Sequence, residues 1–177
     1  MERTGSWRDI NSGGPTTPIT RRYLTLWQDH GINPTNAAYH YLMIPKATVA
    51  RTAELYEHRD VTFLNNNNKI QAVRQSATGI TMANFWDPAG GATGGVIEVN
   101  WLSSVIVQEH DGLLKIGVAE PYRSGNTIRV RITPSLTGYR LLSKDSAVTV
   151  VSTGSSIMLD VRPGTFGGTR YATFTRR

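Results

Sequence analysis

The sequence predicts an all-β protein with a single short helix. Val, Ile and Thr recur along the chain and Gly is plentiful, at 17 of 177 residues, which favours strands and turns over long helices. After residue 60, short segments of alternating apolar and polar residues follow one another at intervals of roughly 8–12 residues, with turn residues between them. This spacing is typical of an antiparallel β-sandwich.

The first part of the chain predicts two strands that are covered on both sides. Residues 2–18 read as an irregular entry segment because they are rich in Ser, Gly and Pro. Residues 21–30 then place aromatic side chains on one face and leucines on the other, so we expect a strand with apolar neighbours on both faces. Residues 37–44 predict a second buried strand after the Asn33-Pro34 turn.

The helix is expected at about residues 47–57. Pro45 opens it, because a proline in the first turn loses no backbone hydrogen bond that the helix would use. Val49, Ala53 and Tyr56 follow at intervals of four and three residues and form a narrow apolar stripe.

Near residue 60 the sequence changes to short alternating segments separated by turns. This change predicts a second domain, so we divide the chain into residues 1–59 and 60–177. The Asp111-Gly112 pair predicts a tight hairpin turn, because both positions tolerate positive φ angles. Around residue 130, apolar residues alternate with Arg129 and Arg131, which indicates a half-buried strand with a basic outer face. The expected strands are 60–64, 69–75, 79–86, 95–100, 104–110, 113–119, 126–132, 147–151, 156–161 and 170–175.

Composition limits the classes of function. The net charge of +6 is spread along the chain and suits a polyanionic partner, either nucleic acid or acidic polysaccharide, although it also suits a merely soluble surface. There is no cysteine, so disulfides and cysteine-bound metals are excluded. No apolar run is long enough to cross a membrane. The first residues lack the apolar core of a signal peptide, so we expect either an intracellular protein or a start that is not the natural one.

Motifs for cofactors and metals are absent. The four histidines lie neither four residues apart nor in an HExxH pattern, and no phosphate-binding loop or GxSxG turn occurs. We therefore predict no metal, no cofactor and no catalytic residue of these types.

Asp29 and His30 are the candidate acid–base pair. Adjacent residues on a strand point to opposite faces, so Asp29 is badly placed to orient His30. The alternative is a strand end in which Asp29, Asn33 and Asn36 bond to the local backbone, and we favour this interpretation.

Aromatic residues offer a second kind of site, because they can stack on sugar rings. A tryptophan within an alternating strand is more often part of the core. Nucleic-acid binding is disfavoured, because no aromatic residue flanks Arg129 and Arg131. The candidates for sugar contact are Trp7, Trp27, Trp86, Trp101, Tyr122 and Tyr139.

Residues 21–39, RRYLTLWQDHGINPTNAAY, resemble a late segment of polysaccharide lyase family 8. The resemblance continues through YLMIP at 41–45, VTFL at 61–64, IQAVR at 70–74 and ANFW at 83–86, and more loosely through VAEP at 118–121. The family includes hyaluronate, chondroitin AC and xanthan lyases.

The resemblance implies a three-domain parent enzyme: an α/α toroid, a large central β-sandwich and a small C-terminal β-sandwich. Residues 1–59 would be the end of the central domain and residues 60–177 the C-terminal domain. The family cleaves uronic-acid-containing chains by β-elimination, with an Asn, a His and a Tyr that lie in the α/α domain. No position of this sequence matches that motif, so we expect no catalysis by this chain alone.

The expected function is therefore to support one wall of a substrate cleft. The expected partners are acidic polysaccharide and an N-terminal α/α catalytic domain, and the parent enzyme would be extracellular. Arg3 and Arg8, in the entry segment, are the candidate substrate-binding residues, since family β-domains may lend a basic residue to an acidic sugar. The alternative is a free-standing carbohydrate-binding β-sandwich module.

Overall fold

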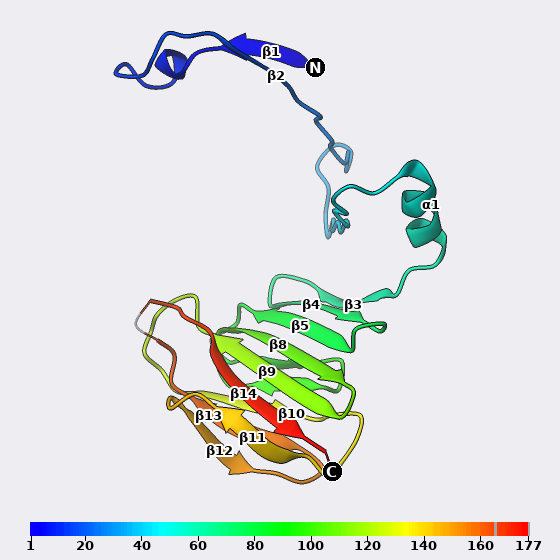
Figure 1. The fold of residues 1–177 in the computed structure, drawn as a ribbon, viewed down its shortest axis with the longest axis vertical. Coiled ribbons are helices and arrows are strands. Elements are labelled where there is room, and N and C mark those ends of the chain that lie inside the picture. Colours follow the sequence, from blue (N-terminus) through cyan, green and yellow to red (C-terminus); the bar gives the residue numbers. More distant parts are fainter. Residues whose placement is uncertain (165, 177) are drawn as a thin grey trace. The chain divides into compact units, whose positions relative to one another are not determined.

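A computed structural model describes residues 1–164 and 166–176 of the chain (Figure 1). It divides into two compact units, Met1–Leu42 and Met43–Arg177, which are described separately below. The structure is nearly all β with one α-helix among the described residues, which confirms the predicted fold class.

The first unit is built on a two-stranded hairpin. Strand β1 (Glu2–Gly5) pairs antiparallel with β2 (Ile19–Arg22), and a short 3-10 turn, η1 (Trp7–Asp9), lies between them. The Asp9 carboxylate fixes the start of that turn, because its Oδ2 accepts a hydrogen bond of 2.6 Å from the backbone N–H of Ser6.

The prediction of two covered strands, at residues 21–30 and 37–44, is wrong. Only residues 19–22 belong to a strand, and no regular element lies between residues 23 and 44. Leu24 and Leu26 are 85% and 84% exposed. A strand with apolar groups on both faces needs hydrogen-bonding neighbours and cover on each side, and the described residues supply neither.

Helix α1 (Val49–Glu57) confirms the single short helix and corrects how it begins. Its N-cap is Thr48, whose side chain accepts a hydrogen bond of 3.1 Å from the backbone N–H of Arg51. Pro45 therefore precedes the helix and does not open it. The expected apolar stripe is not buried, since Val49 is 90% and Tyr56 73% exposed.

The second unit contains two antiparallel sheets that form a sandwich (Figure 1). One sheet has five strands in the order β12-β13-β10-β7-β6, and the other has seven in the order β11-β14-β9-β8-β5-β4-β3. The strands are β3 (Val61–Asn66), β4 (Ile70–Gln75), β5 (Ile80–Phe85), β6 (Gly91–Thr93), β7 (Ile97–Val99), β8 (Ser103–His110), β9 (Leu113–Ala119), β10 (Ile128–Ile132), β11 (Arg140–Lys144), β12 (Val148–Ser152), β13 (Ile157–Val161) and β14 (Arg170–Thr175).

Each of the ten strands expected after residue 60 overlaps an observed strand. The hairpin between β8 and β9 turns at Asp111 and Gly112, whose φ angles of 48° and 73° are the positive values that such a turn requires. The sequence missed β6 and β11, which are short or lie at the edge of their sheets and lack regular alternation.

The core is a single apolar cluster to which both sheets contribute. In β10, Ile128, Val130 and Ile132 are fully buried, while Arg129 and Arg131 face outward, as the alternation predicted. The largest buried apolar side chains from the two sheets are Phe85, Ile97, Leu114, Ile116, Ile128, Ile132, Ile157, Leu159 and Phe174.

Glu109 fastens the loop between β10 and β11 to the seven-stranded sheet. Its carboxylate accepts hydrogen bonds from the backbone N–H groups of Ser135 and Leu136, at 2.7 and 3.0 Å, and from the hydroxyl of Tyr139 at 3.1 Å. Burial alone would raise the pKa of Glu109, but these hydrogen bonds outweigh it and lower the pKa. Burial and the neighbouring carboxylate raise the pKa of Tyr139 to about 12, so its hydroxyl remains a donor.

We predict that Glu109→Gln costs about 1 kcal/mol of unfolding free energy at neutral pH, because a neutral amide accepts the three hydrogen bonds more weakly. The folded pKa of Glu109 lies below its usual value of 4.5, so its contribution is complete above that value and is lost as the pH falls through the folded pKa. Urea unfolding of both proteins across this range checks the prediction. A free-energy difference that stays constant with pH would contradict it.

Candidate functional site

The β1–β2 hairpin places two arginines directly opposite each other. In its register Arg3 pairs with Arg21, and Glu2 pairs with Arg22. Successive residues point to opposite faces of a strand, so the two pairs lie on different faces. On one face Arg22 Nε lies 3.1 Å from Glu2 Oε2, and that face is neutral. The other face carries two positive charges.

The contacts of Arg3 and Arg21 leave these charges uncompensated. Arg3 Nε donates to the sulfur of Met1 at 3.0 Å, and Arg21 Nη1 donates to the backbone oxygen of Thr20 at 2.9 Å. Both acceptors are neutral, and within residues 1–164 and 166–176 neither arginine forms an ion pair. Like charges directly opposite on a hairpin are destabilising. An anion with two acceptor oxygens, such as a carboxylate or a sulfate, would relieve the repulsion.

Arg8 lies elsewhere on the same unit, in η1. Its backbone N–H donates to the oxygen of Pro15 at 3.3 Å, and its side chain is exposed. The part of the chain that the structure describes shows no hydrogen bond between Arg8 and Arg3. Of the two residues that the sequence singled out, Arg3 therefore belongs to a charged pair, and its partner Arg21 was missed.

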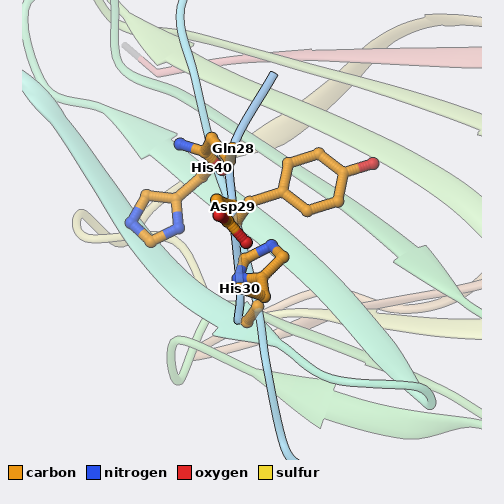
Figure 2. Close-up of a pocket in the computed structure, with 6 residues that line it drawn as sticks. Gln28, Asp29, His30 and His40 are labelled. Carbon is orange, nitrogen blue, oxygen red and sulfur yellow. The ribbon is translucent and has the colours of Figure 1, made fainter. Parts of the chain in front are cut away.

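Asp29 and His30 line a pocket of about 460 Å³ together with Gln28, Tyr39 and His40 (Figure 2). Asp29 Oδ1 accepts a hydrogen bond of 2.8 Å from the backbone N–H of Gly31, which is the local turn that the sequence favoured. The ring of His30 lies 6.4 Å from that of Tyr39 and forms no hydrogen bond with Asp29 in the described structure. The geometry of an acid–base pair is not present here.

The basic outer face predicted for β10 is neutralised by acidic neighbours. Arg129 Nε and Nη2 each lie 2.8 Å from a carboxylate oxygen of Asp160 on β13, and Arg131 Nη1 lies 3.3 Å from Glu98 on β7. The hydrogen bonds with Asp160 raise the pKa of Arg129, and those with Arg129 lower the pKa of Asp160. This face offers little free charge to a nucleic acid.

Several tryptophans lie at the surface, contrary to the expectation that they would be buried. Trp7, Trp27 and Trp86 are 56%, 78% and 39% exposed, while Trp101 packs against the core. Tyr139 is buried and Tyr122 is 58% exposed. The described residues hold no group of three or more His, Cys, Asp or Glu side chains that could bind a metal ion. Their helices include none that is long and apolar enough to cross a membrane.

Comparison with known proteins decides the family. Residues 1–56 match the model of the polysaccharide lyase family 8 super-sandwich domain, and residues 62–129 match the model of that family's C-terminal β-sandwich domain. The chain belongs to polysaccharide lyase family 8.

Relatives and solved structures agree with this family. The chain is 38% identical to a hyaluronate lyase of Thermasporomyces composti over 90% of its length, and 33% identical to a xanthan lyase of Bacillus sp. (strain GL1) over 97%. All of it superposes on a chondroitin AC lyase of Streptomyces coelicolor, with a TM-score of 0.84 and 33% identity. A Paenibacillus xanthan lyase gives a TM-score of 0.83 and 31% identity over 99% of the chain.

These family 8 relatives are much longer. The chain spans 20% and 19% of the two curated relatives, and 23% and 17% of the two solved structures.

We predict that Arg3→Ala and Arg21→Ala each weaken the binding of chondroitin sulfate about fivefold, because either change removes half of the charged pair. Titration calorimetry at low salt measures the effect, with Arg22→Ala as the matched control because Arg22 is already paired with Glu2. The interpretation fails if the Arg22 variant loses as much affinity as the other two.

Proposed function

We propose that these residues form the non-catalytic β-portion of a polysaccharide lyase that acts by β-elimination on uronic-acid-containing polysaccharides. The observation that carries the proposal is the family match, which extends over residues 1–56 and 62–129. The relatives are named for hyaluronate, xanthan and chondroitin, and one solved relative was determined in complex with chondroitin sulphate. This supports an acidic polysaccharide as the substrate.

The proposed role is to support a cleft whose chemistry comes from elsewhere in the enzyme. β-Elimination requires a base within hydrogen-bond reach of the sugar proton and a donor that neutralises the adjacent carboxylate. Asp29 and His30 form no hydrogen bond with each other in the described structure. His110 Nε2 does lie 3.2 Å from Asp111 Oδ2, but both side chains are largely exposed, at the turn between β8 and β9. We therefore assign the chemistry to an α/α catalytic domain that this chain would meet in the intact enzyme.

The exposed segment between residues 23 and 44 supports such a partner. Leu24, Leu26 and Trp27 are all at least 78% exposed, although their alternation is that of a strand with two covered faces. Exposed apolar surface of this kind marks an interaction site. We propose that neighbouring strands of a larger central β-sandwich cover it in the intact enzyme.

The hairpin supplies the contact with substrate in this proposal. Arg3 and Arg21 would bind one acidic group of the polysaccharide, while Arg8 would reach a neighbouring group of the same chain. We further propose a domain boundary near residue 60, close to the gap between the two family matches, and an extracellular location for the intact enzyme. The boundary and the extracellular location rest on the match to the family alone.

A free-standing carbohydrate-binding module remains the second candidate. The observation that favours it is the sandwich of the second unit, which has a complete apolar core of its own. Such a module would bind acidic polysaccharide without cleaving it.

The test is to incubate the purified chain with hyaluronan, chondroitin sulfate and xanthan and to follow the ultraviolet absorbance of the unsaturated uronate product. A full-length chondroitin AC lyase acting on chondroitin sulfate serves as the positive control. We expect no increase with this chain, because Asp29 and His30 do not contact each other and the His110–Asp111 pair lies on an exposed hairpin turn. A steady increase that survives repurification and is lost in His30→Ala would overturn the non-catalytic role and make the Asp29-His30 turn an active site.

A further inference from the structure

The outer face of the seven-stranded sheet carries a row of apolar residues. The register places one residue from each of six adjacent strands in a straight line across the sheet, and each neighbouring pair is directly opposed. Because neighbouring strands lie about 4.8 Å apart, the row spans roughly 24 Å. Its members are Phe63, Val73, Met82, Ile106, Gly117 and Tyr171.

Tyr171 lies over Gly117 and is held against the sheet there. A Cβ atom built on Gly117 would lie 3.0 Å from Tyr171 Cε1 and 2.9 Å from Ile106 Cγ2. The absence of a side chain at Gly117 therefore makes room for the tyrosine ring. Tyr171 remains 55% exposed, so part of the ring faces solvent. An exposed aromatic ring that is held down by its neighbours is a platform on which the apolar face of a sugar can stack.

A row of polar side chains lies beside the apolar row on the same face of the sheet. Asn84 and Ser104 lie in the next row, where Ser104 Oγ donates to Asn84 Oδ1 at 2.7 Å. Gln71 shares that row and accepts a hydrogen bond of 3.3 Å from the indole Nε1 of Trp86. In the described structure these contacts leave the amide nitrogens of Asn84 and Gln71 without a protein acceptor, so both can donate to sugar oxygens.

The charge of this face also suits an acidic chain. The outward positions of the described strands include Lys115 and Arg140 and no Asp or Glu. The carboxylates next to its strands are engaged by neighbouring groups. Asp60 accepts a hydrogen bond of 3.0 Å from the side chain of Gln75, and Asp111 Oδ2 lies 3.2 Å from His110 Nε2. Asp87 pairs with Lys69 at 2.9 Å, and Asp145 accepts a hydrogen bond of 2.9 Å from the backbone N–H of Tyr171.

We propose that this face is a second binding surface for acidic polysaccharide, separate from the hairpin, with Tyr171 as its stacking platform. The surface combines an apolar row, a parallel row with amide donors and two basic side chains, and the outward positions of its strands hold no Asp or Glu. The substrate class rests on the proposed function, while the surface itself rests on the register and the contacts of Gly117. Its role is to hold the polymer on the sandwich.

The test is calorimetric titration of the full chain with chondroitin sulfate decasaccharide and with a neutral glucan decasaccharide. Tyr171→Ala is expected to weaken chondroitin binding about tenfold, while Tyr171→Phe keeps the ring and the affinity. Tyr56→Ala is the matched control, since Tyr56 is 73% exposed and lies in helix α1, outside the sheet. Lys115→Gln should reduce the salt dependence of binding.

Nuclear magnetic resonance on the wild-type chain provides a measurement that depends on no variant. The methyl signals of Met82 and Ile106 should shift on adding the decasaccharide. Three results would each overturn the proposed binding surface. They are unchanged methyl signals, unchanged affinity for chondroitin sulfate in Tyr171→Ala, and equal affinity for the neutral glucan. If binding is lost in Arg3→Ala but not in Tyr171→Ala, this inference fails and the proposed function stands. If the chain binds neither polymer, both fail.

Discussion

The apolar layer between the two sheets of the sandwich is the constraint on which the rest of the structure depends. Strand β10 contributes three fully buried residues to it, and β13 and β14 contribute Leu159 and Phe174. Because side chains alternate along a strand, burying one face fixes which residues face outward on the other. The register that fills the core therefore also sets the salt bridges of β10 and the row that ends at Tyr171.

The residues before the sandwich show what happens without such a layer. Residues 23–44 have the apolar pattern of covered strands, yet they are irregular and exposed. A sequence pattern states which faces could be buried, but the burial itself requires a partner. The same reasoning explains why every strand expected after residue 60 was found: each has a neighbour within the described chain. Most strands of the second unit were predictable from alternation, although β6 and β11 were not, and the structure of residues 23–44 was not.

The candidate site was only partly predictable, because register is invisible in a single sequence. Arg3 and Arg8 could be proposed as basic residues in an irregular segment, but only the hairpin register shows that Arg3 faces Arg21. The carboxylates that neutralise Arg129 and Arg131 lie on other strands. Tyr171 gains its position from a row of six strands and from a glycine far away in the sequence. Each of these relations is tertiary, so no local pattern could reveal it.

The two parts of the chain differ in whether they contain the partners that bury their apolar residues. The sandwich contains its own apolar core. Residues 23–44 are exposed, and we propose that the strands that cover them belong to the rest of the intact lyase. Amide hydrogen exchange on the isolated chain tests this division most directly. We predict slow exchange in residues 128–132 and exchange close to the unfolded rate in residues 23–30, which have no ladder to protect them. Equally slow exchange in both segments would contradict the account.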